Sequence, residues 1–369
     1  MFCTKTRTTL LFKITFYILE SIGGPFALAR EKSDKKHSIP RDCIHILSLR
    51  IMNAFTPTPR KVALIMGVAN QRSIAMSCME SFLEKGDWDV ILTMQNEKTK
   101  AKVQKMIEQR HAQSQQTIIN NNNIQHDINN NGYNHTRGKI LGDFVCDISD
   151  PRSTELFFRE SLPETLQSEE NNNAELQAVI HSIAFAPDLR KPLLETSREA
   201  FLEAHEISAY SLIQVARETL PYFGGNRQEG VEGDNNTSSC SRSSITTLSY
   251  LGADRAIPGY HAMGPAKASL ESIVRGLALE LGQHRPTEDA PIVRVNAVRA
   301  GPIPTLSSKG GIAGFGRMRE DVRLKAPLGN VSASQVASTV YHLAAEATGM
   351  TGQTIDVDGG YSTVGGSIP

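Results

Sequence analysis

The chain has 369 residues, of which 40% are hydrophobic and 21% are charged, so it is long enough for one large globular domain or two ordinary ones. Lysine plus arginine balance aspartate plus glutamate at 39 each, so the overall charge gives no reason to expect nucleic acid or an anionic membrane surface as a partner. The five cysteines are scattered, without a C-x-x-C pair or metal-ligand spacing, which indicates a reduced compartment and no structural zinc.

The first 58 residues differ from the rest and are predicted to be a targeting extension. Their apolar run, LLFKITFYIL, is too short and too charged to span a membrane. ALA at 27–29 suits a signal-peptidase site, and the following stretch is basic and poor in acids, as transit peptides are. Because Met52 could itself be a start, an over-extended reading frame is the alternative. The globular domain is expected at 59–369.

Two internal stretches, at about 109–138 and about 224–243, are predicted to be polar surface insertions. The first is rich in asparagine and glutamine, and the second in glycine, serine, asparagine and charge. Neither can bury enough apolar surface to offset the entropy of ordering it.

Outside these stretches, short apolar runs alternate with helical patterns. Strand-like runs with little polar alternation, separated by helices, predict a parallel sheet covered on both faces. The expected fold class is α/β, a Rossmann-type doubly wound sheet of seven parallel strands with ligands at the carboxyl ends of the strands. The runs are 61–66, 89–94, 143–148, 178–183, 244–249, 292–298 and 353–358.

The loop after the first run, GVANQRSIA at 67–75, leads into a helix, whose N-terminal N–H groups and dipole can hold a pyrophosphate. Gly67 is its only glycine, so G-x-G-x-x-G is absent and the loop alone is a weak signal. Gln95 directly follows the second run, with Glu97 close by. Since glutamine can hydrogen-bond a ribose and glutamate repels a 2′-phosphate, NADH is favoured over NADPH.

The stretch SYLGADRAIPGYHAMGPAK, 249–267, contains two tyrosines and a lysine, and Lys267 follows Tyr260 by seven residues. Many oxidoreductases of this fold place the lysine four residues after the tyrosine. Helix positions seven apart differ by about 20° and are displaced by roughly 10.5 Å along the axis, so the pair can share a face with a longer reach. Pro265 is tolerated in a first helical turn, so the helix is alternatively expected to begin near Gly264, with Tyr260 before it.

Other motifs occur in order along the chain: MQNEK, HSIAFAP, AHEISAYS, AKASLE, VRVNAVRAGPIPTLSS and DVDGGYS. With GVANQRSIA and the tyrosine–lysine stretch, they resemble the enoyl-acyl-carrier-protein reductases of type II fatty acid synthesis. That family is a divergent branch of the short-chain dehydrogenase/reductase superfamily, and the Y-x6-K spacing is its own. The resemblance runs from about residue 60 to the C-terminus, apart from the two insertions.

The resemblance implies reduction of a trans-2-enoyl thioester on acyl carrier protein by hydride transfer from NADH, the last step of the elongation cycle. Tyr260 would donate a hydrogen bond to the developing enolate, and Lys267 would hold the nicotinamide ribose. Tyr250 would place the substrate or supply a proton, and Ala186 would face the substrate beside both tyrosines. The implied cofactor-binding residues are Gly67, Ser73, Ile74, Gln95, Asp147, Ile148, Ile183, Lys267, Ile303, Pro304, Thr305, Leu306 and Ser307.

The stretch 309–325 has apolar residues at helical spacing and more basic than acidic residues. In the family this is the mobile substrate-binding segment. Its apolar face is therefore expected at the acyl chain and its basic residues at the acidic carrier protein, and a solvated amphipathic helix is the alternative. The apolar residues are Ile312, Phe315, Met318 and Val322.

Two other functions stay open. A carbonyl-reducing short-chain dehydrogenase would be expected to show Y-x-x-x-K, and an NAD-binding protein without turnover would not need Tyr260, Lys267 and Tyr250 together. Family members are usually homotetramers, and no metal, nucleic acid or membrane partner is expected. The N-terminal extension and the asparagine tracts imply a eukaryotic chain of the plastid, with a cytoplasmic or mitochondrial location as alternatives.

Overall fold

The computed structural model describes residues 60–85, 87–122, 138–171, 174–224, 243–284, 287 and 290–365. The predicted targeting extension lies outside these residues. So do 123–137 and 225–242, which hold half of the first predicted insertion and almost all of the second.

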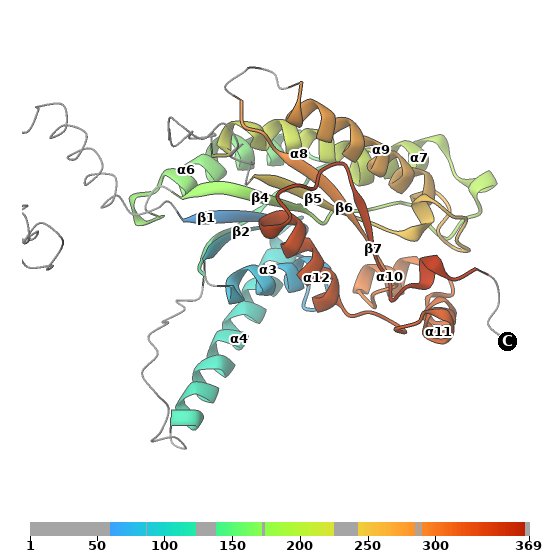
Figure 1. The fold of residues 1–369 in the computed structure, drawn as a ribbon, viewed down its shortest axis with the longest axis horizontal. Helices are drawn as coiled ribbons and strands as arrows, with labels where there is room; N and C mark the ends of the chain where they lie inside the picture. The colour runs from blue at the N-terminus through green and yellow to red at the C-terminus, as the bar shows by residue number, and fades with distance from the viewer. Residues whose placement is uncertain are drawn as a thin grey trace, which may run out of the picture. The chain divides into compact units, whose positions relative to one another are not determined.

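Seven strands form one sheet in the order β3-β2-β1-β4-β5-β6-β7, and every neighbouring pair is parallel (Figure 1). The predicted fold class is confirmed. The strand order reverses between β1 and β4, and in such sheets this reversal opens a ligand crevice at the carboxyl ends. The strands are β1 Lys61–Met66, β2 Trp88–Met94, β3 Ile140–Val145, β4 Glu175–His181, β5 Ser244–Ser249, β6 Arg294–Ala300 and β7 Thr354–Val357.

Two strands end earlier than the sequence predicts. The apolar runs at 143–148 and 178–183 extend past the last residues of β3 and β4. Cys146 and Ile148 are buried although they lie outside the ladder, so their apolar character reflects packing at the sheet edge and not strand pairing. Ile183 likewise packs against the core after β4 has ended. The other predicted runs overlap their strands closely.

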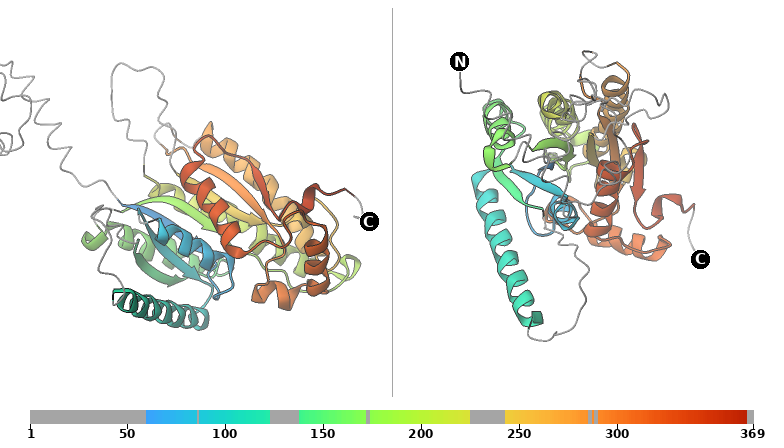
Figure 2. Two further views of the ribbon diagram at one scale, coloured as in Figure 1. Left: turned by 60° about the horizontal axis from the view of Figure 1, so that its bottom comes forward. Right: turned by 60° about the vertical axis from the view of Figure 1, so that its left-hand side comes forward.

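Helices cover both faces of the sheet (Figures 1 and 2). The core on one face includes side chains from α3, α4 and α12, and the core on the other includes side chains from α8, α9 and the segment that joins α5 to α6. The α-helices are α3 Ile74–Glu84, α4 Glu97–Asn122, α5 Pro151–Leu156, α6 Leu162–Gln167, α7 Arg198–His205, α8 Ser211–Thr219, α9 Met263–Gly282, α10 Leu306–Gly311, α11 Phe315–Lys325 and α12 Ala333–Tyr341. Three π-helical segments occur among the described residues: η2 Phe157–Ser161 joins α5 to α6, η5 Glu206–Tyr210 joins α7 to α8, and η8 His342–Glu346 follows α12.

The helix α4 extends into the first predicted insertion. It begins at Glu97 and continues to Asn122, so the range from 109 to 122 is helical. Within the described residues, no helix is both long and apolar enough to cross a bilayer.

An aromatic cluster joins α3, β2 and α12. The ring of Phe82 lies 5.1 Å from the ring of Trp88 and 5.0 Å from that of Tyr341, both in edge-on arrangements. Phe82 and Trp88 are almost fully buried, and edge-on pairs add attraction beyond the burial of apolar area. The cluster therefore ties the two covering helices to the amino end of β2.

We expect Phe82→Ala to lower the free energy of unfolding by about 3–5 kcal/mol, because it leaves a cavity between three elements. Denaturant unfolding followed by circular dichroism measures the loss. Leu194→Ala is the control, since the Leu194 side chain is fully exposed and should change stability by less than about 0.5 kcal/mol. Equal effects of the two substitutions would contradict the described packing.

Candidate active site

The predicted cofactor residues lie directly after the carboxyl ends of strands. Gly67 follows β1, Gln95 follows β2, Asp147 lies beyond β3 and Ile183 lies beyond β4. The stretch from Ile303 to Ser307 comes after β6 and leads into α10. Because the strands are parallel, these positions share one edge of the sheet, where the sequence predicted a dinucleotide site.

Gly67 is required at the turn after β1. Its φ of +80° lies in the region that favours glycine, and a Cβ atom there would come within 2.2 Å of the carbonyl oxygen of Ser182. Its backbone N–H donates to the carbonyl of Thr93 in β2. The single glycine of this loop therefore lets the chain pass close to the end of β4.

Ser73 forms the N-cap of α3. Its hydroxyl accepts from the N–H of Met76 at 3.3 Å and donates to the carbonyl of Asn70 at 2.7 Å. Ile74 is the first helical residue. The Ser73 hydroxyl thus shapes the loop, while the N-terminus of α3 supplies the N–H groups and the dipole that favour a phosphate.

The ends of β2 and β3 are joined by a polar contact. Gln95 Nε2 lies 3.4 Å from Asp147 Oδ2, and the other carboxylate oxygen of Asp147 accepts from the backbone and the hydroxyl of Ser149. Ile148, the next residue in the loop, is buried. This edge offers an amide, a carboxylate and an apolar surface, which fit a ribose and an adenine ring.

Tyr260 lies before the helix and not on it. The helix α9 begins at Met263, so Pro265 is in its first turn, as the alternative prediction required. Pro265 has no N–H to donate to the carbonyl of His261, four residues before it. That carbonyl accepts instead from Gly264 N at 3.3 Å. The interpretation in which Tyr260 and Lys267 share one helix face is therefore wrong.

Tyr250 and Tyr260 pack against each other. Their ring centroids are 4.8 Å apart at an interplanar angle of 61°, and Ala186 packs on the same cluster. The close fit depends on Gly252, because a Cβ atom there would lie 2.3 Å from Cδ1 of Tyr260. The three residues predicted to meet the substrate are thus together.

Both tyrosines are held in the protonated form. Burial raises the pKa of Tyr260 well above its ordinary value, and Tyr250 and Glu271 raise it further. Burial also raises the pKa of Tyr250, with smaller contributions from Tyr361 and Asp358. A buried, protonated phenol is a hydrogen-bond donor, which is the role that a developing oxyanion requires. In this structure the Tyr250 hydroxyl donates to Met318 Sδ at 3.1 Å.

Lys267 on α9 is buried, with 4% of its surface exposed. Its Nζ donates to the carbonyl of Leu248 at 2.8 Å. Burial lowers the pKa of Lys267 to about 8, while Glu271 acts in the opposite direction. The neighbouring His181 is neutral, because burial and then Lys267 lower its pKa to about 3, and its ring hydrogen-bonds Thr247 and Ser211.

Sequence reasoning missed an ion pair beside Lys267. Glu271 and Arg299 form two hydrogen bonds, at 2.6 and 2.7 Å, and Glu271 also accepts from Ser249 Oγ at 2.6 Å. Two features of the sequence could have indicated this ion pair: a glutamate on the apolar face of a helix and an arginine at the end of an apolar strand. Such charges are rarely buried without a partner.

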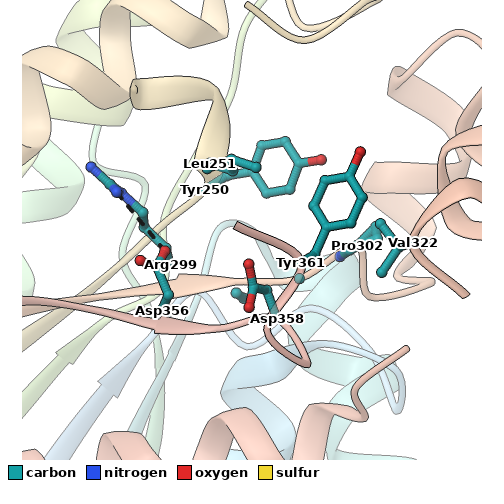
Figure 3. Close-up of a pocket in the computed structure, with 10 residues that line it drawn as sticks. Tyr250, Leu251, Arg299, Pro302, Val322, Asp356, Asp358 and Tyr361 are labelled. Carbon is teal, nitrogen blue, oxygen red and sulfur yellow. Dashed lines mark ion pairs between the residues drawn. The ribbon is translucent and has the colours of Figure 1, made fainter. Parts of the chain in front are cut away.

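A small pocket adjoins Tyr250 on the side of β6 and β7 (Figure 3). The rings of Tyr250 and Tyr361 lie beside each other in it, above the carboxylate of Asp358, and Arg299 faces Asp356 at 3.9 Å. Tyr361 donates in turn to Asp321 of α11 at 2.6 Å. Tyr250 therefore packs against Tyr260 and also lines this pocket.

The stretch 309–325 is not a single helix, because Gly314 adopts a left-handed conformation between α10 and α11. Ile312 lies in the break and packs on the tyrosine cluster, whereas Phe315 and Val322 are buried along α11. An Arg190 guanidinium donates to the carbonyl of Gly310 and holds α10 against the loop after β4. The four predicted apolar residues therefore do not share one helical face, although Ile312 packs on the tyrosine cluster and Met318 Sδ accepts from the Tyr250 hydroxyl.

Known proteins resemble this chain over most of its length. The family described as enoyl-(acyl carrier protein) reductase matches residues 133–362. Enoyl-acyl-carrier-protein reductase (NADH) of Bacillus cereus is 33% identical over 309 residues, which are 83% of this chain and 98% of the relative. An NADPH-dependent counterpart from Staphylococcus aureus is also 33% identical, over 82% of this chain and 97% of the relative.

Solved structures agree with these relatives. The Bacillus cereus reductase with NADP+ and indole naphthyridinone has a TM-score of 0.62 at 32% identity and covers 83% of this chain and 98% of its own. The NADH reductase of Aquifex aeolicus has a TM-score of 0.61 at 31% identity and covers 84% and 99%. The fold, the paired tyrosines with a buried lysine and these similarities lead to one conclusion: the chain belongs to the enoyl-acyl-carrier-protein reductase family.

Proposed function

We propose that the chain reduces trans-2-enoyl-acyl-carrier-protein to acyl-carrier-protein with NADH, the last step of the type II fatty acid elongation cycle. The observation that carries the proposal is the packing of the protonated Tyr250 on the buried, protonated Tyr260, together with the buried Lys267 on the helix that begins three residues after Tyr260, at the edge of the sheet where dinucleotides bind. The relatives named above bear this activity in their names, which supports the same reaction here.

Tyr260 donates to the thioester oxygen as enolate charge develops on it. The tyrosine is fixed by Gly252, Tyr250 and the start of α9, so the donor needs little reorganisation during the reaction. Lys267 binds the hydroxyls of the nicotinamide ribose, and its positive charge favours the enolate. Bound NADH supplies the hydride that goes to the β-carbon.

Tyr250 and Ala186 contact the acyl thioester next to Tyr260. The Tyr250 hydroxyl exchanges Met318 Sδ for the substrate, which requires α11 to move as the acyl chain enters. Tyr250 then places the thioester or supplies the proton for the α-carbon.

The cofactor lies along the carboxyl edge of the sheet. Gly67, Ser73 and Ile74 form the pyrophosphate loop, Gln95 binds the adenosine ribose, and Asp147 with Ile148 contacts the adenine. Toward the nicotinamide end, Ile183 and the stretch Ile303, Pro304, Thr305, Leu306 and Ser307 complete the site. NADH is proposed over NADPH because the polar groups at the ribose position, Gln95 and Asp147, include a carboxylate and no arginine.

Two alternatives are less well supported. A carbonyl-reducing short-chain dehydrogenase is disfavoured by glycine and aspartate at the positions four residues after the two tyrosines. A cofactor-binding protein without turnover is disfavoured by the intact tyrosine–lysine cluster, and a measurement of turnover decides it.

The test of the reaction uses residues 56–369 with crotonyl thioester and follows the loss of reduced-nicotinamide absorbance with NADH and NADPH in parallel. We expect turnover that prefers NADH. Tyr260→Phe should reduce kcat by roughly 100- to 1,000-fold, because it removes an oxyanion donor while keeping the ring.

Normal NADH binding by Tyr260→Phe is the control for folding. Cofactor binding without turnover in the unchanged chain would favour the binding protein, and reduction of a ketone but not of the enoyl thioester would favour the carbonyl reductase.

The carrier protein is proposed to dock beside α11. This helix carries more basic than acidic residues, although Arg323 pairs with Glu320 and Lys325 pairs with Asp321. Arg317 and Arg319 are therefore better candidates than Arg323 for contact with an acidic partner.

We expect Arg317→Glu with Arg319→Glu to raise KM several-fold for a carrier-protein substrate but not for crotonyl coenzyme A. The difference arises because only the carrier protein presents an extended acidic surface to the helix. Equal KM values for the carrier-protein substrate before and after the substitutions would contradict the docking surface.

Assembly and location are proposed separately. A homotetramer is proposed because members of the family are usually homotetramers, and light scattering of the purified chain tests it. A plastid location rests on residues 1–58 acting as a transit peptide. Fusion of this segment to a fluorescent protein tests it, and cytoplasmic or mitochondrial fluorescence would contradict it.

A further inference from the structure

The mechanism above does not use the ion pair between Glu271 and Arg299, although it lies one helical turn from Lys267. The guanidinium donates through Nη2 at 2.6 Å and through Nε at 2.7 Å, one bond to each carboxylate oxygen. The side chains are 6% and 18% exposed, respectively. A two-pronged pair that is largely shielded from water holds a fixed geometry.

The pair connects α9 to the end of β5. Glu271 accepts from Ser249 Oγ, and Lys267 donates to the carbonyl of Leu248, the residue before it. Ser249 also faces Arg299 across the ladder between β5 and β6. The two residues that precede Tyr250 are therefore held by a helix on one side and by a strand on another.

The carboxylate of Glu271 also shifts the pKa values of Lys267 and of groups near it. It raises the pKa of Lys267 against the effect of burial, and it contributes to raising the pKa values of Tyr260 and of Asp356 in β7. His181 from β4 is neutral, and the positive Arg299 from β6 is neutralised by Glu271 itself. Glu271 is therefore the group that favours the ammonium form of Lys267.

We propose that Glu271 and Arg299 are positioning residues for the reductase reaction. The pair fixes the backbone that presents Tyr250, and its carboxylate keeps Lys267 protonated although Lys267 is buried. Arg299 is needed because an unpaired carboxylate in this environment would be strongly destabilising. The inference rests on the proposed function, in which Lys267 binds the cofactor ribose as an ammonium.

The test is Glu271→Gln in the 56–369 protein, with turnover and NADH binding both measured against pH. Binding is read from the fluorescence of bound NADH without substrate. The ammonium is present below the pKa of Lys267 and lost above it, and removal of the carboxylate lowers that pKa from about 8. We expect the alkaline limb of both profiles to move to lower pH, and kcat to fall roughly tenfold or more as Tyr250 is displaced.

A second variant separates charge from folding. Glu271→Gln with Arg299→Gln removes both charges, so no ion is left unpaired and thermal stability should recover toward that of the parent. The alkaline limb should stay at lower pH, because the carboxylate is still missing. If the limb returns to the parent position, the unpaired arginine caused the shift and the inference is overturned.

A matched control uses another carboxylate in an ion pair. Asp87 pairs with Lys61 at 2.9 Å near the amino ends of β2 and β1, at the opposite edge of the sheet, so Asp87→Asn should leave both pH profiles unchanged. Unchanged profiles in Glu271→Gln would overturn the inference. Absence of enoyl reduction in the parent contradicts the proposed function instead, while the NADH-binding profile still tests the ion pair.

Discussion

The contact of α9 with the carboxyl end of β5 is the interaction on which the site depends. Lys267 donates to the backbone of Leu248, and Glu271 accepts from Ser249, so one helix face holds two consecutive strand residues. Tyr250 then follows directly, and the chain returns to place Tyr260 against it before α9 begins. The geometry of both tyrosines therefore derives from one helix–strand contact, with Gly252 allowing the rings to come close.

The cofactor half of the site depends on the parallel sheet. Apart from Lys267 on α9, the cofactor candidates lie in or beside the segments that follow strand ends, and parallel pairing brings these ends to one edge. Gly67 lets the first turn pass the end of β4, and Ser73 caps the helix that follows. The loop therefore needs only one glycine to make its turn, because Gly67 is its only residue with a positive φ.

Electrostatic effects act differently on the two tyrosines and on the lysine of the site. Around the tyrosines, burial and nearby carboxylates keep both phenols protonated, so they act as donors and not as bases. Lys267 is subject to opposing effects, with burial disfavouring its charge and Glu271 favouring it. A neutral His181 completes this environment without adding charge.

The sequence by itself determined the class of the sheet, its seven apolar runs and the identity of the Tyr260–Lys267 pair, because strand periodicity and residue spacing are local properties. It also limited the start of α9, since Pro265 fits only near a helix N-terminus. Only the tertiary structure decided where β3 and β4 end, that the helix breaks at Gly314, and that Glu271 pairs with Arg299. Buried loop residues give the same apolar pattern as strand residues, and the pairing of two charges 28 positions apart depends on how a helix packs against a neighbouring strand.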